Sequence, residues 1–477
     1  MATTKILSMI QEVIGLGIPC KSHSDLDWAT YASTYNIRLP VTPAIVIIPT
    51  SLRHIQDAIL CARKHGLRVQ ARSGGHSYAS YSNGGWSGAM IIDLRELNHV
   101  DHRTKPIVVH AGARLGNMAR EIYERPNEKL ALPHGTCAGV GVGGHFTHGG
   151  YGFFSRAWGL AMDRIVGMTV ITADGSCVTA DKEQNQDLFY AMRGAGDSFG
   201  IATSFVLDPV PAPESVVHWS VRLNATKTVG RAVRAFQYVQ DLTRDVFLVD
   251  QFLGLNLTLA SDYFAIEGTY LGSREFFKAG FFSELVEGLP EEATVQMKEL
   301  DWLSTLKLFN QGQAIGTSGT YTEHSSFFAK SVVVPDPGFT KEALTSFFAY
   351  LLVKGARAPI SYFILVDLYG GPGSQINNKD LSFSAFAHRD ALWVAQLYGY
   401  VDDDKEFPAE GVDFVNGLAN SMTQYLPRYG AYSNYTDPGL TKEEAHKLYY
   451  GEELTKTLKD LKKKWDPDNI FQNPQSI

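Results

Sequence analysis

Cysteine is scarce in this sequence. Its 477 residues include four cysteines, Cys20, Cys61, Cys137 and Cys177. So few thiols do not make a disulfide scaffold in a chain this long, and no Cys-x-x-Cys pair gives the spacing of a zinc site. We therefore expect a protein that is not built on disulfides and that holds no metal.

Long apolar runs and basic clusters are also missing. No segment reaches the roughly 18 to 20 apolar residues of a membrane span. Gln11 and Glu12 interrupt the apolar N-terminal run, so we expect no secretory signal and a cytoplasmic protein, with secretion as the alternative. The net charge is -7, and the one basic run, 462–464, lies in a helical pattern that also carries acids. That run is typical of a solvated helix face, which argues against nucleic acid as a partner.

Apolar sequence, by contrast, is plentiful, at 44% of the residues, which is enough for more than one core. The first half alternates strands and helices. Ser51 can cap a helix whose apolar positions recur at helical spacing, and Gly66 ends it. We expect strands at 44–48, 67–71, 90–94, 107–110, 165–172, 177–180 and 201–207, and a helix at 186–193.

Three prolines, Pro209, Pro211 and Pro213, mark a boundary, because proline continues neither a helix nor a sheet interior. Beyond them the pattern changes to longer strands, such as 252–259 and 327–334, with helices such as 274–287. Near the C-terminus, Thr441 and Glu444 form a capping box. We predict three parts, at 1–210, 211–425 and 426–477.

The densest signal is the glycine-rich segment 133–152, with eight glycines in 20 residues. Gly139, Gly141 and Gly144 satisfy G-x-G-x-x-G, but no apolar strand precedes them and the glycines at 149, 150 and 152 would break the helix that should follow. A Rossmann site is therefore rejected, and a tight turn without a ligand is a further alternative. Exposed backbone N–H groups in such a segment suit a pyrophosphate or an electron-rich heterocycle.

A second glycine-rich loop, 72–78, directly follows the strand predicted at 67–71 and contains His76. A single histidine in a loop is structural more often than functional. Here one αβ domain contains two such loops, and the segment 133–152 contains Cys137. This combination favours a shared ligand.

With these loops in view, the sequence resembles the vanillyl-alcohol-oxidase type of FAD-binding protein, in its berberine-bridge-enzyme-like branch. The similarity covers nearly the whole chain, and the nearest pattern is that of fungal gluco- and chitooligosaccharide oxidases. It is carried by Arg-Ser-Gly-Gly-His-Ser-Tyr at 72–78, Gly-Thr-Cys-x-x-Val-Gly-Val-Gly-Gly-His at 135–145, and segments 187–194, 199–201, 387–390, 434–437, 440–445 and 465–471. The implied fold is α+β, with a PCMH-type two-subdomain FAD-binding domain and a substrate domain whose antiparallel sheet is backed by helices.

The resemblance implies FAD bound covalently through His76 to its 8α-methyl and through Cys137 to its C6. His145 would lie near the N1/C2 carbonyl edge of the flavin, where a cation or donor stabilises negative charge, and Val140 would gate oxygen. The further cofactor-binding residues that it implies are Arg72, Ser73, Gly74, Gly75, Ser77, Pro133, Gly135, Thr136, Gly141, Gly144, Gly150, Tyr151, Gly152, Gly200, Ile201 and Asn434.

For catalysis the resemblance implies Tyr435 as the group that takes the substrate hydroxyl proton, with Asp367 paired to it, and Tyr78 beside the tethered histidine. An unperturbed tyrosine has a pKa of about 10, so a neighbour must help it act as a base. We expect a monomer that uses a small-molecule substrate and O2.

The substrate pocket departs from the sugar oxidases. Leu365 stands where they have glutamine and Phe363 where they have tryptophan, whereas Gln396 and Tyr78 are retained. The apolar replacements favour a small natural product oxidised inside the cell. A secreted oligosaccharide oxidase that forms lactones is the alternative, and a non-catalytic flavin-binding protein is a third. Secreted relatives pair the equivalent of Cys61 in a disulfide, and whether Cys20 plays that part here stays open.

Overall fold

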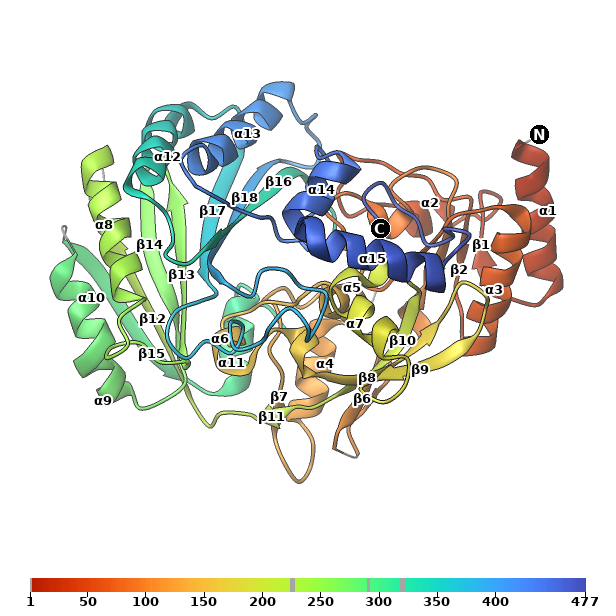
Figure 1. Cartoon of the computed structure of the whole chain (residues 1–477), viewed down its shortest axis with the longest axis horizontal. Helices are drawn as coiled ribbons and strands as arrows, with labels where there is room; N and C mark the ends of the chain where they lie inside the picture. Colours follow the sequence, from red (N-terminus) through yellow and green to blue (C-terminus); the bar gives the residue numbers. More distant parts are fainter. Residues whose placement is uncertain (1, 104, 224–227, 290–291, 318–322) are drawn as a thin grey trace.

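The computed structural model describes residues 2–103, 105–223, 228–289, 292–317 and 323–477 (Figure 1). Two small sheets build the first part. One has the order β1-β2-β4-β3, with β2, β4 and β3 parallel, and the other has the antiparallel order β5-β6-β10-β8-β9. Their strands are β1 (Cys20–Lys21), β2 (Ile45–Ile47), β3 (Val69–Arg72), β4 (Met90–Asp93), β5 (Val100–Asp101), β6 (Ile107–His110), β8 (Ile165–Ile171), β9 (Cys177–Asp181) and β10 (Ile201–Leu207).

Helix α3 (Leu52–His65) shows how local sequence sets these elements. The Ser51 hydroxyl accepts the His54 backbone N–H at 3.3 Å, and Gly66 ends the helix with a φ of 67°. That left-handed conformation favours glycine. The buried face of α3 packs against α1 (Ala2–Gly15). The strand predicted at 67–71 begins two residues later, at Val69.

Five more helices belong to the described residues of this first part, and three of them, α2, α5 and α6, are short. They are α2 (Trp28–Ala32), α4 (Leu115–Tyr123), α5 (Val142–Thr147), α6 (Ser155–Trp158) and α7 (Gln186–Ala195). The proline cluster falls on β11 (Val210–Pro211), which pairs with β7 (Leu130–Ala131) as the chain leaves this part.

A seven-stranded antiparallel sheet builds the second part, in the order β15-β12-β14-β13-β17-β18-β16. Helices α8, α12 and α13 pack beside one another against it, and Figure 1 shows them on its outer side. The strands are β12 (Val216–Leu223), β13 (Leu253–Ala260), β14 (Tyr263–Tyr270), β15 (Ala293–Leu300), β16 (Ser326–Pro335), β17 (Ser361–Leu368) and β18 (Ala391–Val401). The helices are α8 (Val229–Leu242), α9 (Arg274–Phe277), α10 (Ser283–Gly288), α11 (Trp302–Phe309), α12 (Lys341–Lys354) and α13 (Ala409–Thr423).

The helix predicted at 274–287 is interrupted. A π-helical turn, Lys278–Phe282, separates α9 from α10, and Gly280 within it has non-helical angles. Sequence periodicity cannot show such a turn, because the apolar residues on either side keep a helical spacing.

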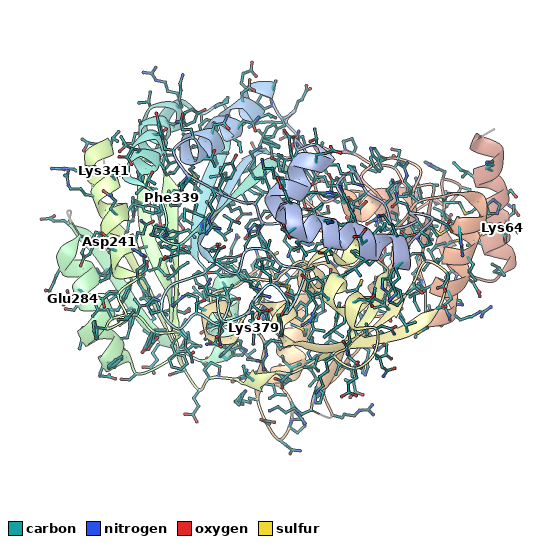
Figure 2. All side chains as sticks on the ribbon, viewed as in Figure 1. Lys64, Asp241, Glu284, Phe339, Lys341 and Lys379 are labelled. Carbon is teal, nitrogen blue, oxygen red and sulfur yellow. The ribbon has the colours of Figure 1, made fainter. Side chains whose placement is uncertain are left out.

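Figure 2 shows Glu284 of α10 and Asp241 of α8 at the edge of the molecule opposite Lys64 of α3.

The C-terminal segment returns to the first part. Helix α14 (Lys442–Tyr449) starts with the predicted capping box, and α15 (Gly451–Trp465) packs against α7 (Figure 1). The prediction of a solvated basic face is wrong for Lys462, which is buried. Its ammonium donates to Asp466 and to the carbonyls of Ser198 and Phe471, so it ties the C-terminal segment to the first part.

Two large cores hold the fold together. One joins residues of the first part to the C-terminal segment and also includes residues of the second part, such as Val333, Tyr369 and Val394. The other fills the space between the seven-stranded sheet and its helices. The boundaries 1–210, 211–425 and 426–477 stay a prediction. Among the described residues, no helix is both long and apolar enough to cross a membrane. All four cysteines belong to the described part of the chain and are free thiols, so Cys20 and Cys61 form no disulfide here.

Candidate active site

A cavity of about 420 Å³ opens where the three parts meet. Its wall combines the loop after β3, the glycine-rich segment, paired residues within β17 and β18, and the segment 432–436. The predicted site residues in this wall are Ser73, Gly74, Gly75, His76, Ser77, Tyr78, Gly135, Thr136, Cys137, Val140, Gly141, Gly144, His145, Tyr151, Gly152, Gly200, Leu365, Asp367, Gln396, Asn434 and Tyr435.

The two glycine-rich loops touch each other. A Cβ at Gly74 would lie 2.2 Å from the Gly141 nitrogen, and a Cβ at Gly141 would lie 2.0 Å from the Gly74 nitrogen. Arg114 holds the loops together by donating to the Gly74 carbonyl at 2.6 Å and the Gly139 carbonyl at 2.8 Å. Glycine at 74 and 141 is therefore required by the close approach of two backbones. This places His76 and Cys137 side by side.

The glycine-rich segment is not loop throughout. Residues 142–147 form helix α5, which ends before Gly149, where φ is 127°. The prediction that no helix follows the G-x-G-x-x-G motif is therefore wrong for residues 142–147. A two-residue strand, β7, stands before the segment, so the βαβ setting of a Rossmann site is not formed.

His76 and Cys137 meet at one end of the cavity together with Glu323. A ring nitrogen of His76, the Cys137 Sγ and a Glu323 carboxylate oxygen all lie within 4.8 Å of one another. The His76 ring stacks on Tyr35, with centroids 4.4 Å apart. Burial, and then the charge of Arg114, lower the pKa of His76 to about 3, so the imidazole is neutral at neutral pH. Desolvation by the surrounding loops raises the pKa of the Cys137 thiol.

His145 lies in α5 and is held as a neutral ring. Burial, and then His134, lower its pKa to about 3, and its Nε2 accepts the Gly135 N–H at 3.0 Å. The ring proton is therefore on Nδ1. His145 was expected to act either as a cation or as a hydrogen-bond donor. A neutral ring with its proton on Nδ1 can act as the donor and not as the cation. Asn434 donates to the His145 carbonyl at 3.4 Å and to the Tyr432 hydroxyl at 3.0 Å, which joins α5 to the segment 432–436.

Tyr435 stands against two other tyrosines. Its ring stacks on Tyr78 with centroids 5.7 Å apart, and Tyr432 meets it edge-on at 5.1 Å. The Tyr78 hydroxyl accepts a hydrogen bond from Gln396 Nε2 at 2.8 Å. Burial, followed by the charge of Asp367, raises the pKa of Tyr435 well above its ordinary value. The phenol of Tyr435 is therefore protonated at neutral pH.

Asp367 is buried on β17, and its carboxyl has an unusually high pKa. Burial raises its pKa to about 7, while a hydrogen bond from Asn256 lowers it and the charge of Glu267 raises it further. Asn256 is its register partner on β13. Among the described residues, no hydrogen bond joins Asp367 directly to Tyr435. The pairing implied by the resemblance is electrostatic here, and the side chain that bonds to Asp367 is Asn256.

Five predicted residues do not line this cavity. Arg72 lies behind the loop, where it forms a buried ion pair with Asp93 at 2.8 Å. Ile201 is packed in the core, and Phe363 stacks on Tyr398 with centroids 4.9 Å apart. Pro133 is buried at the start of the glycine-rich segment, and Gly150 donates its N–H to the Tyr432 hydroxyl. Arg72 and Gly150 therefore support the wall from behind, and Phe363 does not shape the cavity.

Several cavity residues were missed by the sequence analysis. Tyr35, Asn256 and Asp197 reach the wall from distant segments, and Asp197 pairs at 3.3 Å with His148 of the glycine-rich segment. Asn473 and Gln475 also line it, and Asn473 donates to Asp197 at 2.6 Å. The C-terminal Asn-Pro-Gln-Ser-Ile could have signalled these last two, because it continues the family-like segment 465–471.

These residues fit a flavin nucleotide. The cavity volume lies in the range of about 300 to 1,000 Å³ that cofactor sites occupy. A neutral imidazole and a thiol meet at one end, close enough to reach one ring system. At Gly144 a Cβ would meet no atom within 4 Å, so bare backbone faces open space in the wall there.

Comparisons with known proteins agree with this fit. The FAD binding domain family matches residues 43–181, and the berberine and berberine-like family matches residues 431–477. A carbohydrate oxidase from Microdochium nivale is 35% identical over 472 residues, covering 97% of this chain and 93% of that protein. The chain belongs to the berberine-bridge-enzyme-like family of FAD-dependent oxidases.

Two further relatives resemble this chain in sequence or in structure. A xylooligosaccharide oxidase from Thermothelomyces thermophilus is 34% identical, covering 96% of this chain and 92% of that protein. A solved glucooligosaccharide oxidase from Acremonium strictum, described as carrying a 6-S-cysteinyl, 8α-N1-histidyl FAD, superposes with a TM-score of 0.92 at 30% identity, covering 98% and 99% of the two chains. The α+β class with a PCMH-type FAD-binding domain is thereby confirmed, as is the prediction of an FAD-linked oxidoreductase.

Proposed function

We propose that this oxidase acts on a carbohydrate, removing hydride from a carbinol carbon of the sugar and forming a lactone and H2O2. Its FAD would be tethered by His76 and Cys137. The observation that carries the proposal is the convergence of these two side chains at one end of the cavity that also contains Tyr435, Tyr78 and Asp367. The relatives named as carbohydrate and xylooligosaccharide oxidases support the sugar substrate.

When bound, FAD would supply the acceptor for hydride and for the electrons that pass to O2. The protein must then remove the hydroxyl proton as hydride leaves carbon. Tyr435 would receive that proton at its phenol oxygen while its own proton passes to ionised Asp367, through a hydrogen bond that would form in the substrate complex. Tyr78 and Gln396, joined by their hydrogen bond, would orient the substrate hydroxyl beside Tyr435.

A second candidate is the intracellular oxidation of a small natural product. The observation that favours it is Leu365, an apolar side chain in the cavity wall opposite Gln396 in the β17–β18 register. Phe363, the other apolar replacement, does not line the cavity, so the case for an apolar substrate now depends on one residue. We therefore place the sugar substrate first.

The experiment that separates the two candidates is a peroxide assay of the holoenzyme. We expect H2O2 from cello-, xylo- or chitobiose, with aromatic and terpenoid alcohols at background. Turnover of the alcohols alone would replace the sugar proposal with the natural-product one. Flavin that no donor reduces would favour the third alternative, a flavin-binding protein without catalysis.

Leu365→Gln should raise kcat/KM for disaccharides about tenfold or more. The new amide would lie beside Gln396 and could pair with a sugar hydroxyl, and one such hydrogen bond changes discrimination by at least that factor. Leu365→Met is the matched control, since it keeps the volume and adds no polar atom. An equal gain in both variants would show that shape, and not hydrogen bonding, limits sugar binding.

A further inference from the structure

Glu323 brings a carboxylate to the pair of tethering residues. Its Oε2 lies 3.5 Å from His76 Nε2, although its side chain is 58% exposed. The backbone opposite leaves room for it, because a Cβ at Gly139 would lie 2.8 Å from the same oxygen. Glu323 and Gly139 are far apart in sequence, so their approach at this point is a property of the fold.

The Nε2 edge of the His76 ring faces the Glu323 carboxylate. Tyr35 stacks on the ring and holds its plane, and the His76 side chain is 13% exposed. A neutral imidazole has one N–H and one lone pair, and the partner of one nitrogen decides which nitrogen carries the proton. A carboxylate oxygen 3.5 Å from Nε2 favours the tautomer with the proton on Nε2 and the lone pair on Nδ1.

We propose that Glu323 is the positioning residue for covalent flavin attachment at His76. Its carboxylate holds the proton on Nε2, leaves Nδ1 as the nucleophile, and accepts the Nε2 proton as Nδ1 bonds to the flavin. This inference rests on the proposed His76 tether. It adds the group that prepares the histidine, following the general pattern in which a nucleophile is oriented by an adjacent base.

A C–H bond of the flavin 8α-methyl breaks and its proton moves to the flavin nitrogens, while the Nδ1–C8α bond forms and the Nε2 proton passes to Glu323. The flavin is left reduced by two electrons. Molecular oxygen, the electron acceptor of the oxidase, takes these electrons and is reduced to H2O2. Glu323 then releases its proton to water, which its exposed side chain permits.

The test uses the full chain with Cys137→Ala, so that His76 is the only tether. Protein from flavin-starved cells is mixed with FAD in air, and samples are precipitated with acid over time to measure the flavin that stays in the pellet. We expect Glu323→Gln to slow attachment about 100-fold, the size of a general-base effect. Asp403→Asn, an amide change at another exposed acid, should attach flavin within twofold of the parent rate.

Two further measurements separate proton transfer from a structural role. Glu323→Gln should bind FAD before attachment with unchanged affinity, measured by flavin fluorescence. Formate should restore attachment at least tenfold in Glu323→Ala, because a small carboxylate can occupy the vacated position. Attachment by Glu323→Gln at the parent rate, or no formate rescue, would overturn the inference. A parent that retains no flavin would instead refute the proposed His76 tether.

Discussion

Replacing Tyr435 by Phe is expected to slow flavin reduction by the substrate about 1,000-fold. The variant loses the phenol oxygen that would take the substrate hydroxyl proton, and a positioned proton acceptor contributes roughly 10²- to 10⁴-fold. The ring remains, so its stacking on Tyr78 and its contact with Tyr432 are kept. Anaerobic stopped-flow mixing, followed by the loss of oxidised flavin colour, measures this rate without the oxygen step.

Tyr398→Phe is the matched control for this change. Tyr398 belongs to a neighbouring stack with Phe327 and Phe363 and does not line the cavity. We expect its rate of flavin reduction to stay within about threefold of the wild type. If Tyr435→Phe reduced the flavin as fast as this control, Tyr435 would not be the proton acceptor.

Replacing Asp367 by Asn is expected to lower kcat/KM about 100-fold or more and to abolish its pH dependence near neutrality. Only ionised Asp367 can accept a proton. With a pKa raised to about 7, the wild-type rate should therefore rise with pH through about 7 and level off above it. Glu267→Gln should move the wild-type midpoint to lower pH, because the charge of Glu267 raises the pKa of Asp367. A midpoint unchanged in both variants would assign the titration to another group.

The same substitution should affect stability in the opposite sense. The folded protein holds the Asp367 proton more tightly than the unfolded chain, so ionising Asp367 costs stability as the pH rises from about 4 through 7. Asp367→Asn removes that cost and can keep the hydrogen bond to Asn256. We expect its free energy of unfolding to exceed the wild type by up to about 4 kcal/mol at pH 8 and to match it at pH 4. Denaturant unfolding at both pH values measures the difference.

The sequence was most informative where structure is local. The cap at Ser51, the glycine end of α3 and the capping box of α14 formed as predicted, because each depends on residues a few positions apart. The two glycine-rich loops were found for the same reason. The backbone contact between Gly74 and Gly141 supplies the physical cause of their composition.

The sequence was least informative where distant segments meet. Arg114, Glu323 and Asn256 have no local motif, and each reaches the site through a long-range contact. Lys462 was misassigned as solvated because a basic run on an amphipathic helix does not reveal which lysine points inward. The role of a residue in such places is decided by its partners in space.

The cavity has two regions, one that would hold the flavin and one that would act on the substrate. His76 and Cys137 would fix the flavin, while the chemistry on the substrate side depends on Tyr435, Asp367 and the residues beside them. The position of Tyr435 and Asp367 relative to the flavin therefore depends on its attachment at that end of the cavity.

The most direct test is to precipitate the protein with acid and measure the flavin that stays with it. We expect one FAD per chain in the wild type, retention in both His76→Ala and Cys137→Ala, and complete loss in the double variant. Peptide masses should place flavin on the segments containing His76 and Cys137. Flavin found entirely in the supernatant of the wild type, or retained by the double variant, would contradict attachment through these two residues.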